Sequence, residues 1–225
     1  MLNDDLGDIP ALVPIFPLPE VVMFPRAVLP LHIFEPRYRE MTADALLRDG
    51  YIATALLQPG FEPQYYTRRA PIHRVISVGK IIASEELDDG NFNILLRGLA
   101  RARIQREVPH ESYRVGCIEL IESHAISPCM EKQLRCDLRQ TVCRELVDVD
   151  VQKHWLQLFE CSLNLGELVD AIASTLPVDA ELRQDLLNEA DPAARAVALR
   201  DHLRTLAAVT QTRRSQCSAP QWGMN

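Results

Sequence analysis

The sequence predicts an α+β protein, in which a partly closed β-barrel with one inserted helix is followed by an α-helical bundle. Up to about Ser123, short apolar or alternating runs are separated by prolines, glycines and turn residues. From about Pro128, apolar residues instead recur three or four positions apart, which is typical of helices. We therefore expect a β domain over residues 1–125, a helical bundle domain over 126–212 and a disordered tail over 213–225.

The first 50 residues predict short strands and then a helix. Three apolar runs are expected to be strands, at residues 12–16, 21–24 and 28–29. The prolines between them fix φ and remove backbone donors, so the chain must run in short extended pieces with corners. Pro36 suits the first turn of a helix, and Gly50 is the expected stop.

The rest of the β domain is a series of longer strand patterns. They cover residues 51–57, 72–84, 92–96, 99–108 and 113–121, with Gly98 between the third and the fourth. Gly79 interrupts the second pattern, which predicts a bulge or bend there. The run Asp88-Asp89-Gly90-Asn91 predicts a hairpin turn, because Gly and Asn supply the positive φ that tight turns need.

The second half of the sequence is helical. Helices are expected at residues 128–146, 154–160, 166–176, 180–189 and 192–211. Asp179 and Asp191 are the expected N-caps of the last two. In the first helix, the apolar arc of one half lies roughly opposite that of the other half, which predicts a connector between the two domains.

Charge and hydropathy narrow the class of protein. The net charge is −7, with 13 basic and 17 acidic side chains in residues 1–125 and 11 and 14 in the remainder. This even, acidic balance disfavours nucleic acid as a partner. No apolar run approaches the roughly 20 residues that span a bilayer, and the acidic N-terminus lacks the apolar core of a signal peptide. A cytoplasmic protein with no membrane partner is expected.

The sequence predicts no catalytic residue, metal site or cofactor. Ser77-Val78-Gly79-Lys80 matches an S-x-x-K nucleophile pattern, but that chemistry needs a helix start and this segment has a strand pattern. The cysteines at 129, 136 and 143 are spaced two helical turns apart, about 10 Å, which is too far to share one zinc ion. Packing is the expected role of these thiols.

The loop at residues 58–71 is the richest candidate for binding. Its aromatic and basic side chains are Phe61, Tyr65, Tyr66, Arg68 and Arg69. Aromatic and arginine residues are enriched at interface hot spots, and loops of this length are often functional. Two interpretations stay open for it, an interaction loop and a mobile connection.

Two further groups of charged residues are structural or anion-binding candidates. Arg101, Arg103 and Arg106 lie along one strand pattern, where they either bind an anion or RNA or pair with nearby carboxylates. The other group is expected to fix the inserted helix onto the barrel through a Glu–Arg pair, and consists of Glu35, Arg37, Tyr38 and Arg97.

An ordered set of motifs resembles the N-terminal domain of Lon proteases. The set begins with PLPEVVMFPRAVLPLHIFEPRYREM at residues 17–41 and continues through Val78-Gly79-Lys80 and the hairpin turn to Leu95-Leu96-Arg97-Gly98-Leu99-Ala100-Arg101. In the helical half it includes residues 168–173, Pro177 and the Arg-Gln-Asp-Leu-Leu-Asn-Glu run at 183–189. The resemblance covers about residues 11–210 and implies a PUA-like β domain followed by a helical bundle.

This resemblance implies a non-catalytic module that binds unfolded or exposed polypeptide segments, with a proteolysis adaptor or a holdase as candidate roles. The binding residues that we expect are Phe34 and the five side chains of the 58–71 loop. The alternative is RNA or nucleotide binding through the PUA-like domain, for which Arg101, Arg103 and Arg106 are the candidates.

The resemblance stops short of a complete Lon protease. No G-x-x-x-x-G-K-[ST] motif occurs, since Gly79-Lys80 is followed by Ile81. Neither the ATPase nor the Ser-Lys peptidase module has a counterpart in the sequence. We therefore expect a stand-alone protein that is not an enzyme. Its oligomeric state, the identity of its partner and cooperation with a separate protease are left open.

Overall fold

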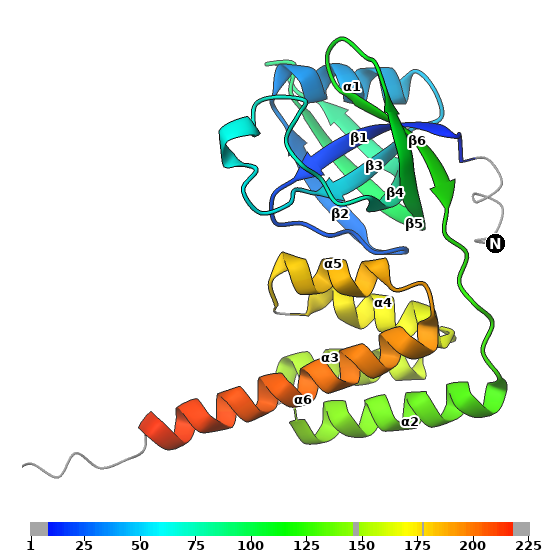
Figure 1. The fold of residues 1–225 in the computed structure, drawn as a ribbon, viewed down its shortest axis with the longest axis vertical. Helices are drawn as coiled ribbons and strands as arrows, with labels where there is room; N and C mark the ends of the chain where they lie inside the picture. The colour runs from blue at the N-terminus through cyan, green and yellow to red at the C-terminus, as the bar shows by residue number, and fades with distance from the viewer. Residues whose placement is uncertain (1–8, 146–148, 177, 218–225) are drawn as a thin grey trace, which may run out of the picture. The chain divides into compact units, whose positions relative to one another are not determined.

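The α+β prediction is confirmed by the computed structural model, which describes residues 9–145, 149–176 and 178–217 (Figure 1). The chain divides into two compact units. The first, here the sheet unit, contains Met1–Ser123 and Asp170–Ala190; the second, the helical unit, contains His124–Val169 and Asp191–Asn225. The segment Asp170–Ala190 lies outside the expected residues 1–125, yet it packs with the β-strands.

The sheet unit is built on one mixed sheet of six strands. These are β1 (Leu12–Leu18), β2 (Val28–Ile33), β3 (Tyr51–Leu56), β4 (Val75–Glu86), β5 (Phe92–Val108) and β6 (Arg114–Leu120). Their order is β2-β5-β4-β3-β1-β6, and β6 also pairs with β5, so the sheet curves round onto itself. It is not a regular barrel, because β1 and β3 run parallel and β2 is attached outside the ring, to β5 only.

The bend expected at Gly79 is present as a shift in the β4–β5 register between Val78 and Gly79. A second shift follows between Ile81 and Ala83, and a third, between Ile104 and Arg106, lies in the β5–β6 pairing. Bulges of this kind increase the local twist of a strand. They allow the 17 residues of β5 to pair with β2, β4 and β6.

The run at residues 21–24 was wrongly expected to be a strand. It has no strand pairing, although Val22, Met23 and Phe24 are buried. The backbone here passes very close to β5, because a Cβ atom at Gly98 would lie only 2.2 Å from the Phe24 carbonyl oxygen. Burial and not pairing therefore accounts for the apolar character of this run.

The inserted helix, α1 (Pro36–Leu46), starts at the expected proline. Figure 1 shows it lying across one end of the strands. Tyr38, Met41 and Ala45 enter the core together with side chains from β1, β3 and β5. The helix ends four residues before Gly50, whose φ of +75° turns the chain into β3.

The helical unit contains α2 (Pro128–Glu145), α3 (Val149–Glu160), the start of α4 (Leu165–Thr175) and α6 (Pro192–Cys217). The prediction that the first of these helices connects two domains is wrong, since α2 lies within the helical unit, where it packs against α3 and α6. Its buried side chains are Leu138, Thr141 and Val142. Cys129, Cys136 and Cys143 are exposed on α2, so their expected packing role is also wrong.

Helix α6 continues to Cys217, six residues beyond the end at residue 211 that the sequence predicted. Residues 218–225, like the acidic N-terminal residues 1–8, lie outside the described part of the chain.

Side-chain caps fix the starts of the C-terminal helices. Asp179 caps α5 (Ala180–Asn188) by accepting a bond from the Leu182 amide at 2.8 Å, as predicted. Asn164 and Glu167 exchange bonds at the start of α4, each side chain accepting from the other's backbone amide at 2.9 Å. Such caps satisfy amides that have no partner within the helix.

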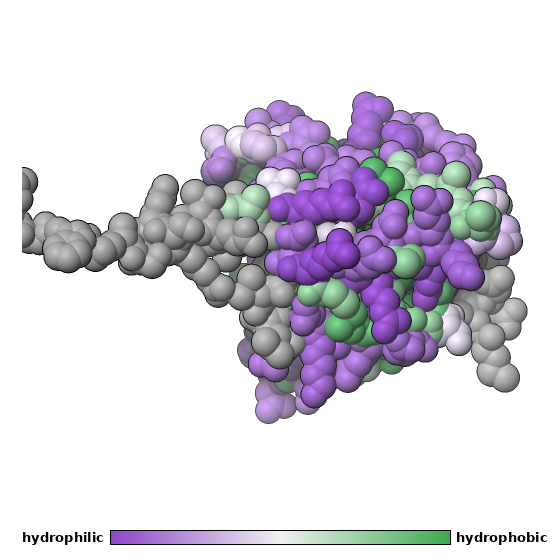
Figure 2. Space-filling view, turned by 90° about the horizontal axis from the view of Figure 1, so that it is seen from below, coloured by the Kyte–Doolittle hydropathy of each residue, from purple (hydrophilic) through white to green (hydrophobic). Residues whose placement is uncertain are grey.

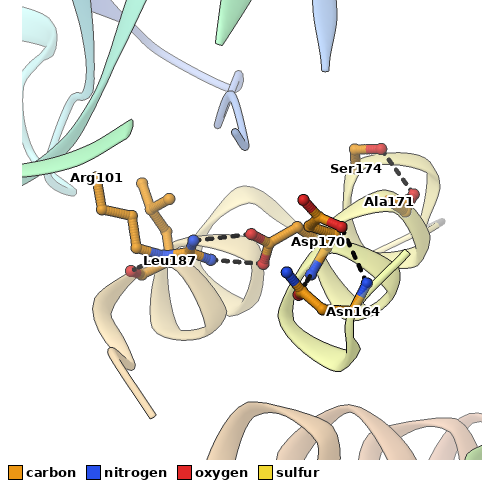
Figure 3. Close-up of polar contacts among 7 residues, drawn as sticks. Arg101, Asn164, Asp170, Ala171, Ser174 and Leu187 are labelled. Carbon is orange, nitrogen blue, oxygen red and sulfur yellow. Dashed lines mark hydrogen bonds and ion pairs between the residues drawn. The ribbon is translucent and has the colours of Figure 1, made fainter. Parts of the chain in front are cut away.

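The α4–α5 segment of the sheet unit is attached to the sheet through a buried arginine. Arg101 of β5 is 5% exposed and forms a bidentate pair with Asp170, with N–O distances of 2.6 and 2.8 Å (Figure 3). Its Nε donates to the Leu187 carbonyl at 3.1 Å. A second bond runs from the Gln184 side chain to the Val75 carbonyl of β4 at 2.9 Å. The segment is therefore held at two strands.

Among the residues that the structure describes, no helix is both long enough and apolar enough to cross a membrane. The face drawn in Figure 2 is largely hydrophilic, and its hydrophobic side chains occur in several small groups.

We expect Asp170→Ala to lower the free energy of unfolding by about 3–5 kcal/mol, because it leaves a buried guanidinium without its carboxylate. Urea unfolding of the wild type and the variant measures the change in the free energy of unfolding. Glu160→Ala is the control, since Glu160 pairs with Arg139 on the surface and should cost less than about 1 kcal/mol. Equal effects of the two substitutions would contradict a structural role for the buried pair.

Candidate functional site

The loop at residues 58–71, here the aromatic loop, has a defined conformation. Its base is closed by a bond from the Gln58 amide to the Pro71 carbonyl at 2.8 Å. A short 3₁₀ turn at Glu62–Gln64 and the Thr67 hydroxyl, which donates to the Gln64 carbonyl at 2.7 Å, shape its interior. These bonds favour the interaction-loop interpretation over the mobile connection.

The three aromatic side chains of this loop contact one another. The ring centroids of Phe61 and Tyr65 are 5.6 Å apart, and those of Tyr65 and Tyr66 are 5.0 Å apart in an edge-on arrangement. Tyr66 is the most open of the three, with 83% of its surface exposed. The loop thus presents an aromatic side chain to solvent on a packed support.

Two arginines from elsewhere in the sheet unit hold the aromatic loop by its carbonyl oxygens. Arg37 of α1 donates to the carbonyls of Tyr65 and Thr67, at 3.2 and 3.3 Å. Arg114 of β6 donates to the Ala70 carbonyl at 2.5 Å. Each arginine binds several groups at once because the guanidinium presents five N–H donors in a planar fork.

Each of these arginines is itself oriented by a carboxylate. Glu35 lies 2.8 Å from Arg37, and Glu107 lies 2.6 Å from Arg114. The Glu35–Arg37 pair joins the two residues that the sequence suggested, and Arg37 also lies over the Tyr38 ring at 4.4 Å. Arg37 therefore has a role beyond α1, because it also holds the aromatic loop in place.

The turn between β5 and β6 is attached to the same helix. Ser112 donates to Glu40 at 2.8 Å, and the Tyr113 hydroxyl donates to Asp44 at 2.7 Å. Arg37, Glu40 and Asp44 are spaced three and four residues apart in α1, so the three side chains lie on one face of the helix. Helix α1 therefore supports both the aromatic loop and the turn.

A cleft of about 600 Å³ opens between the aromatic loop and the β5–β6 turn. We call it the loop cleft; it is lined by Arg37, Tyr66, Thr67, Arg68, Arg69 and residues from Glu107 to Arg114. Arg68 and Arg69 are exposed, and among the described residues no acidic group pairs with either guanidinium. Its volume is in the range of ligand pockets.

A second cleft lies close to Phe34, along strands β2, β4 and β5. This sheet cleft, of about 480 Å³, is lined by Pro30, Leu31 and His32 of β2 and by residues 83–85 and 93–95 of β4 and β5. Phe34 is 62% exposed, and its ring stacks against His32 with centroids 6.1 Å apart. The predicted binding residues therefore form two groups, Phe34 at the sheet cleft and the aromatic loop at the loop cleft.

The arginines of β5 do not form one surface. Arg103 and Arg106 are exposed, but Arg101 is buried against Asp170. The sequence allowed these arginines either to bind an anion or RNA or to pair with carboxylates, and Arg101 pairs with a carboxylate. Arg97 also lies in β5, where it is in register with Val28 and Lys80. It is therefore placed at a different position from the Glu35–Arg37 pair, with which the sequence had grouped it.

Sequence reasoning missed the second wall of the loop cleft. Glu107, His110 and Arg114 are contributed by the β5–β6 hairpin, in which Val108 and Val115 are in register. The adjacent strand patterns at 99–108 and 113–121 indicated this hairpin, but they did not indicate that its turn lies opposite the aromatic loop.

Burial shifts the ionisation of the tyrosines around these contacts. It raises the pKa of Tyr38 to about 12, with Arg37 acting in the opposite direction. Burial also raises the pKa of Tyr113, as does the hydrogen bond to Asp44, and burial is the first cause of the raised pKa of Tyr65. All three phenols are therefore neutral at physiological pH.

The S-x-x-K segment and the residue types that bind metals were also located among the described residues. Ser77 is buried within β4, and Lys80 lies over the Tyr51 ring at 5.0 Å, so the S-x-x-K segment is part of a strand as predicted. Within the described ranges, no three His, Cys, Asp or Glu side chains gather where they could hold a metal ion.

Residues 12–205 match the family of the ATP-dependent protease La (LON) substrate-binding domain. The chain belongs to this family. The match includes β1 to β6, the aromatic loop and most of α6, so both clefts lie inside the Lon substrate-binding domain.

Curated relatives are Lon proteases. The chain is 26% identical to the Lon protease of Anaeromyxobacter dehalogenans over 190 residues, and 26% identical to Lon protease 2 of Myxococcus xanthus over 190 residues. Each alignment covers 84% of this chain but only 22% and 23% of those proteins, respectively. The chain thus spans less than a quarter of the length of these relatives.

Solved structures share the fold. The Lon N-terminal domain protein from Xanthomonas campestris has a TM-score of 0.60 at 22% identity, covering 84% of this chain and 96% of that one. The N-terminal domain of Lon protease from the Mycobacterium avium complex has a TM-score of 0.64 at 15% identity, covering 85% and 97%.

We expect Arg37→Met to increase tryptic cleavage after Arg68 and Arg69 by about tenfold, because two bonds that hold the aromatic loop are lost. Mass spectrometry of short digests measures the cleavage rate. Arg103→Met removes an exposed arginine of β5 and serves as the control. Unchanged cleavage in Arg37→Met would show that the loop does not depend on this side chain.

We expect Tyr38→Phe to make the protein less sensitive to alkali. The folded-state pKa of about 12 exceeds the ordinary value of 10, so stability is fully present below pH 10 and is lost as pH rises towards 12. At pH 11 this tyrosine should cost the wild type about 1 kcal/mol that the variant does not lose. Melting temperatures at pH 8 and pH 11 test this, and identical losses in both proteins would contradict it.

Proposed function

We propose that this protein is a non-catalytic module that binds unfolded or exposed polypeptide segments. Membership of a family of substrate-binding domains supports the general role of substrate recognition. A proteolysis adaptor or a holdase, acting in the cytoplasm, is the specific role that we infer. As an adaptor the module would present bound polypeptide to a separate protease.

The observation that carries this proposal is the exposure of aromatic side chains on rigid supports. Phe34 stands at the end of β2, immediately before α1, and Tyr66 stands on the aromatic loop. Exposed apolar surface of this kind is removed from water when it meets a hydrophobic segment, at roughly 25 cal/mol per Å² buried. Rigid supports reduce the entropy that is lost on binding.

The sheet cleft adds apolar surface beside Phe34. Leu95 is in register with Pro30 on one side and Ala83 on the other, and all three side chains are exposed. β2 lies at the edge of the sheet, where Pro30 costs no ladder hydrogen bond. Pro30 also lacks the N–H that an added strand would need, so side-chain contact is the favoured mode of binding.

RNA or nucleotide binding through a PUA-like sheet unit is the second candidate. Exposed Arg103 and Arg106 favour it, whereas the burial of Arg101 and the net charge of −7 count against it. Binding of this kind would weaken steeply with added salt and would be lost in Arg103→Gln/Arg106→Gln.

We expect Phe34→Ser/Tyr66→Ser to weaken binding of a fluorescent, permanently unfolded polypeptide by at least tenfold, because each substitution removes an exposed aromatic anchor. Fluorescence anisotropy measures the affinity, with single-stranded RNA as a parallel probe.

The matched control for this experiment is Leu47→Ser. Leu47 is 86% exposed and follows α1 at the end opposite to Phe34, so the substitution removes a similar side chain away from both clefts. Loss of binding in this control to the same extent, or undiminished binding in the double variant, would argue against the proposed surface.

A further inference from the structure

The loop cleft collects positive charge in an acidic protein. Four arginines contribute to its lining, while the whole chain carries a net charge of −7. Two of the four are neutralised locally, since Arg37 pairs with Glu35 and Arg114 pairs with Glu107. Arg68 and Arg69 remain, with no acidic partner among the described residues.

Neutral donors accompany these two guanidinium groups. The Nδ1 atom of His110 faces the backbone amides of Ser112 and Tyr113, at 3.3 and 3.4 Å, and accepts from them. In a neutral imidazole whose Nδ1 accepts, Nε2 carries the proton and is a donor. Tyr66 adds a phenolic hydroxyl to the same lining. Both walls are held in place by α1, so the donors are arranged before a ligand arrives.

We propose that the loop cleft recognises a carboxylate group on the bound polypeptide, from either its C-terminus or an acidic side chain. The guanidinium fork matches a carboxylate in geometry as well as in charge. This inference rests on the proposed function and defines the substrate as a hydrophobic segment that carries a nearby carboxylate.

The electrostatics favour a carboxylate over a polyanion. Because Glu35 and Glu107 neutralise Arg37 and Arg114, the lining arginines leave about two uncompensated positive charges, which suit a single carboxylate better than a polyphosphate chain. The field of the whole acidic protein acts in the same direction. Tyr66, two residues before Arg68 in the chain, offers an apolar contact beside the charged group.

The test compares three peptides of the same neutral, apolar sequence, labelled with a neutral dye. One has an amidated C-terminus, one has a free C-terminal carboxylate, and one is amidated but carries two glutamates. Anisotropy titrations with the wild type should give about fivefold tighter binding when the preferred carboxylate is present. The second or third peptide, whichever gains affinity, identifies the source. The gain should shrink as ionic strength rises from about 50 mM to about 0.5 M.

Arg68→Gln/Arg69→Gln should abolish this gain, so that the variant binds all three peptides with similar affinity. Both side chains are exposed, so the variant should fold, which circular dichroism verifies. Arg103→Gln/Arg106→Gln removes two exposed arginines from β5 of the same unit and should retain the gain.

The outcomes separate this inference from the proposed function. Equal affinity of the wild type for all three peptides would overturn the carboxylate site while polypeptide binding stands. An equal loss for all peptides in Arg68→Gln/Arg69→Gln would also overturn it, because it would reduce the arginines to a structural role. Failure of every peptide to bind would remove both proposals. If single-stranded RNA binds more tightly than any peptide, and if this variant no longer binds RNA, the ligand of the loop cleft would be a phosphate and not a carboxylate.

Discussion

The buried pair between Arg101 and Asp170 is the interaction on which the sheet unit depends. It joins β5, the longest strand and the one that pairs with three others, to a segment nearly 70 residues later in the chain. Its guanidinium also binds the Leu187 carbonyl and lies 5.9 Å from the centre of the Phe24 ring. One side chain therefore unites the sheet, the α4–α5 segment and the buried run before β2. A guanidinium suits this position because it can satisfy a carboxylate and a carbonyl at once.

The same chemistry recurs at the loop cleft with a different purpose. There Arg37 and Arg114 use part of their donor set on carboxylates and the rest on carbonyls of the aromatic loop. This leaves Arg68 and Arg69 available to a ligand. The four arginines of the loop cleft thus fall into two that build the site and two that face it, and carboxylate pairing separates the two groups.

The periodic parts of the fold could be predicted from the sequence, whereas the long-range contacts could not. Strand alternation, the helix start at Pro36 and the Asp179 cap are local signals, and each was found. The run at 21–24 was misassigned because burial alone produces the same apolar composition as a short strand. The cysteine spacing in α2 suggested packing, but a repeat of seven specifies only that the residues share a face. It does not specify which face is buried.

The candidate site was predicted in part for the same reason. The aromatic loop stands out by composition, and the Glu35–Arg37 pair lies within three residues. The opposite wall of the loop cleft depends on α1 contacting the β5–β6 turn across about 70 residues of sequence, and no single sequence reveals such a contact.

The sheet unit is discontinuous in the chain, since Asp170–Ala190 belongs to it while the residues before and after form the helical unit. During synthesis the strands leave the ribosome long before the carboxylate that neutralises Arg101. Domains generally fold as units once their residues are available. The nascent sheet must therefore wait, with the Arg101 guanidinium still unpaired, until translation has passed Ala190. By then more than half of the helical unit has also been made, but α6 is still to come.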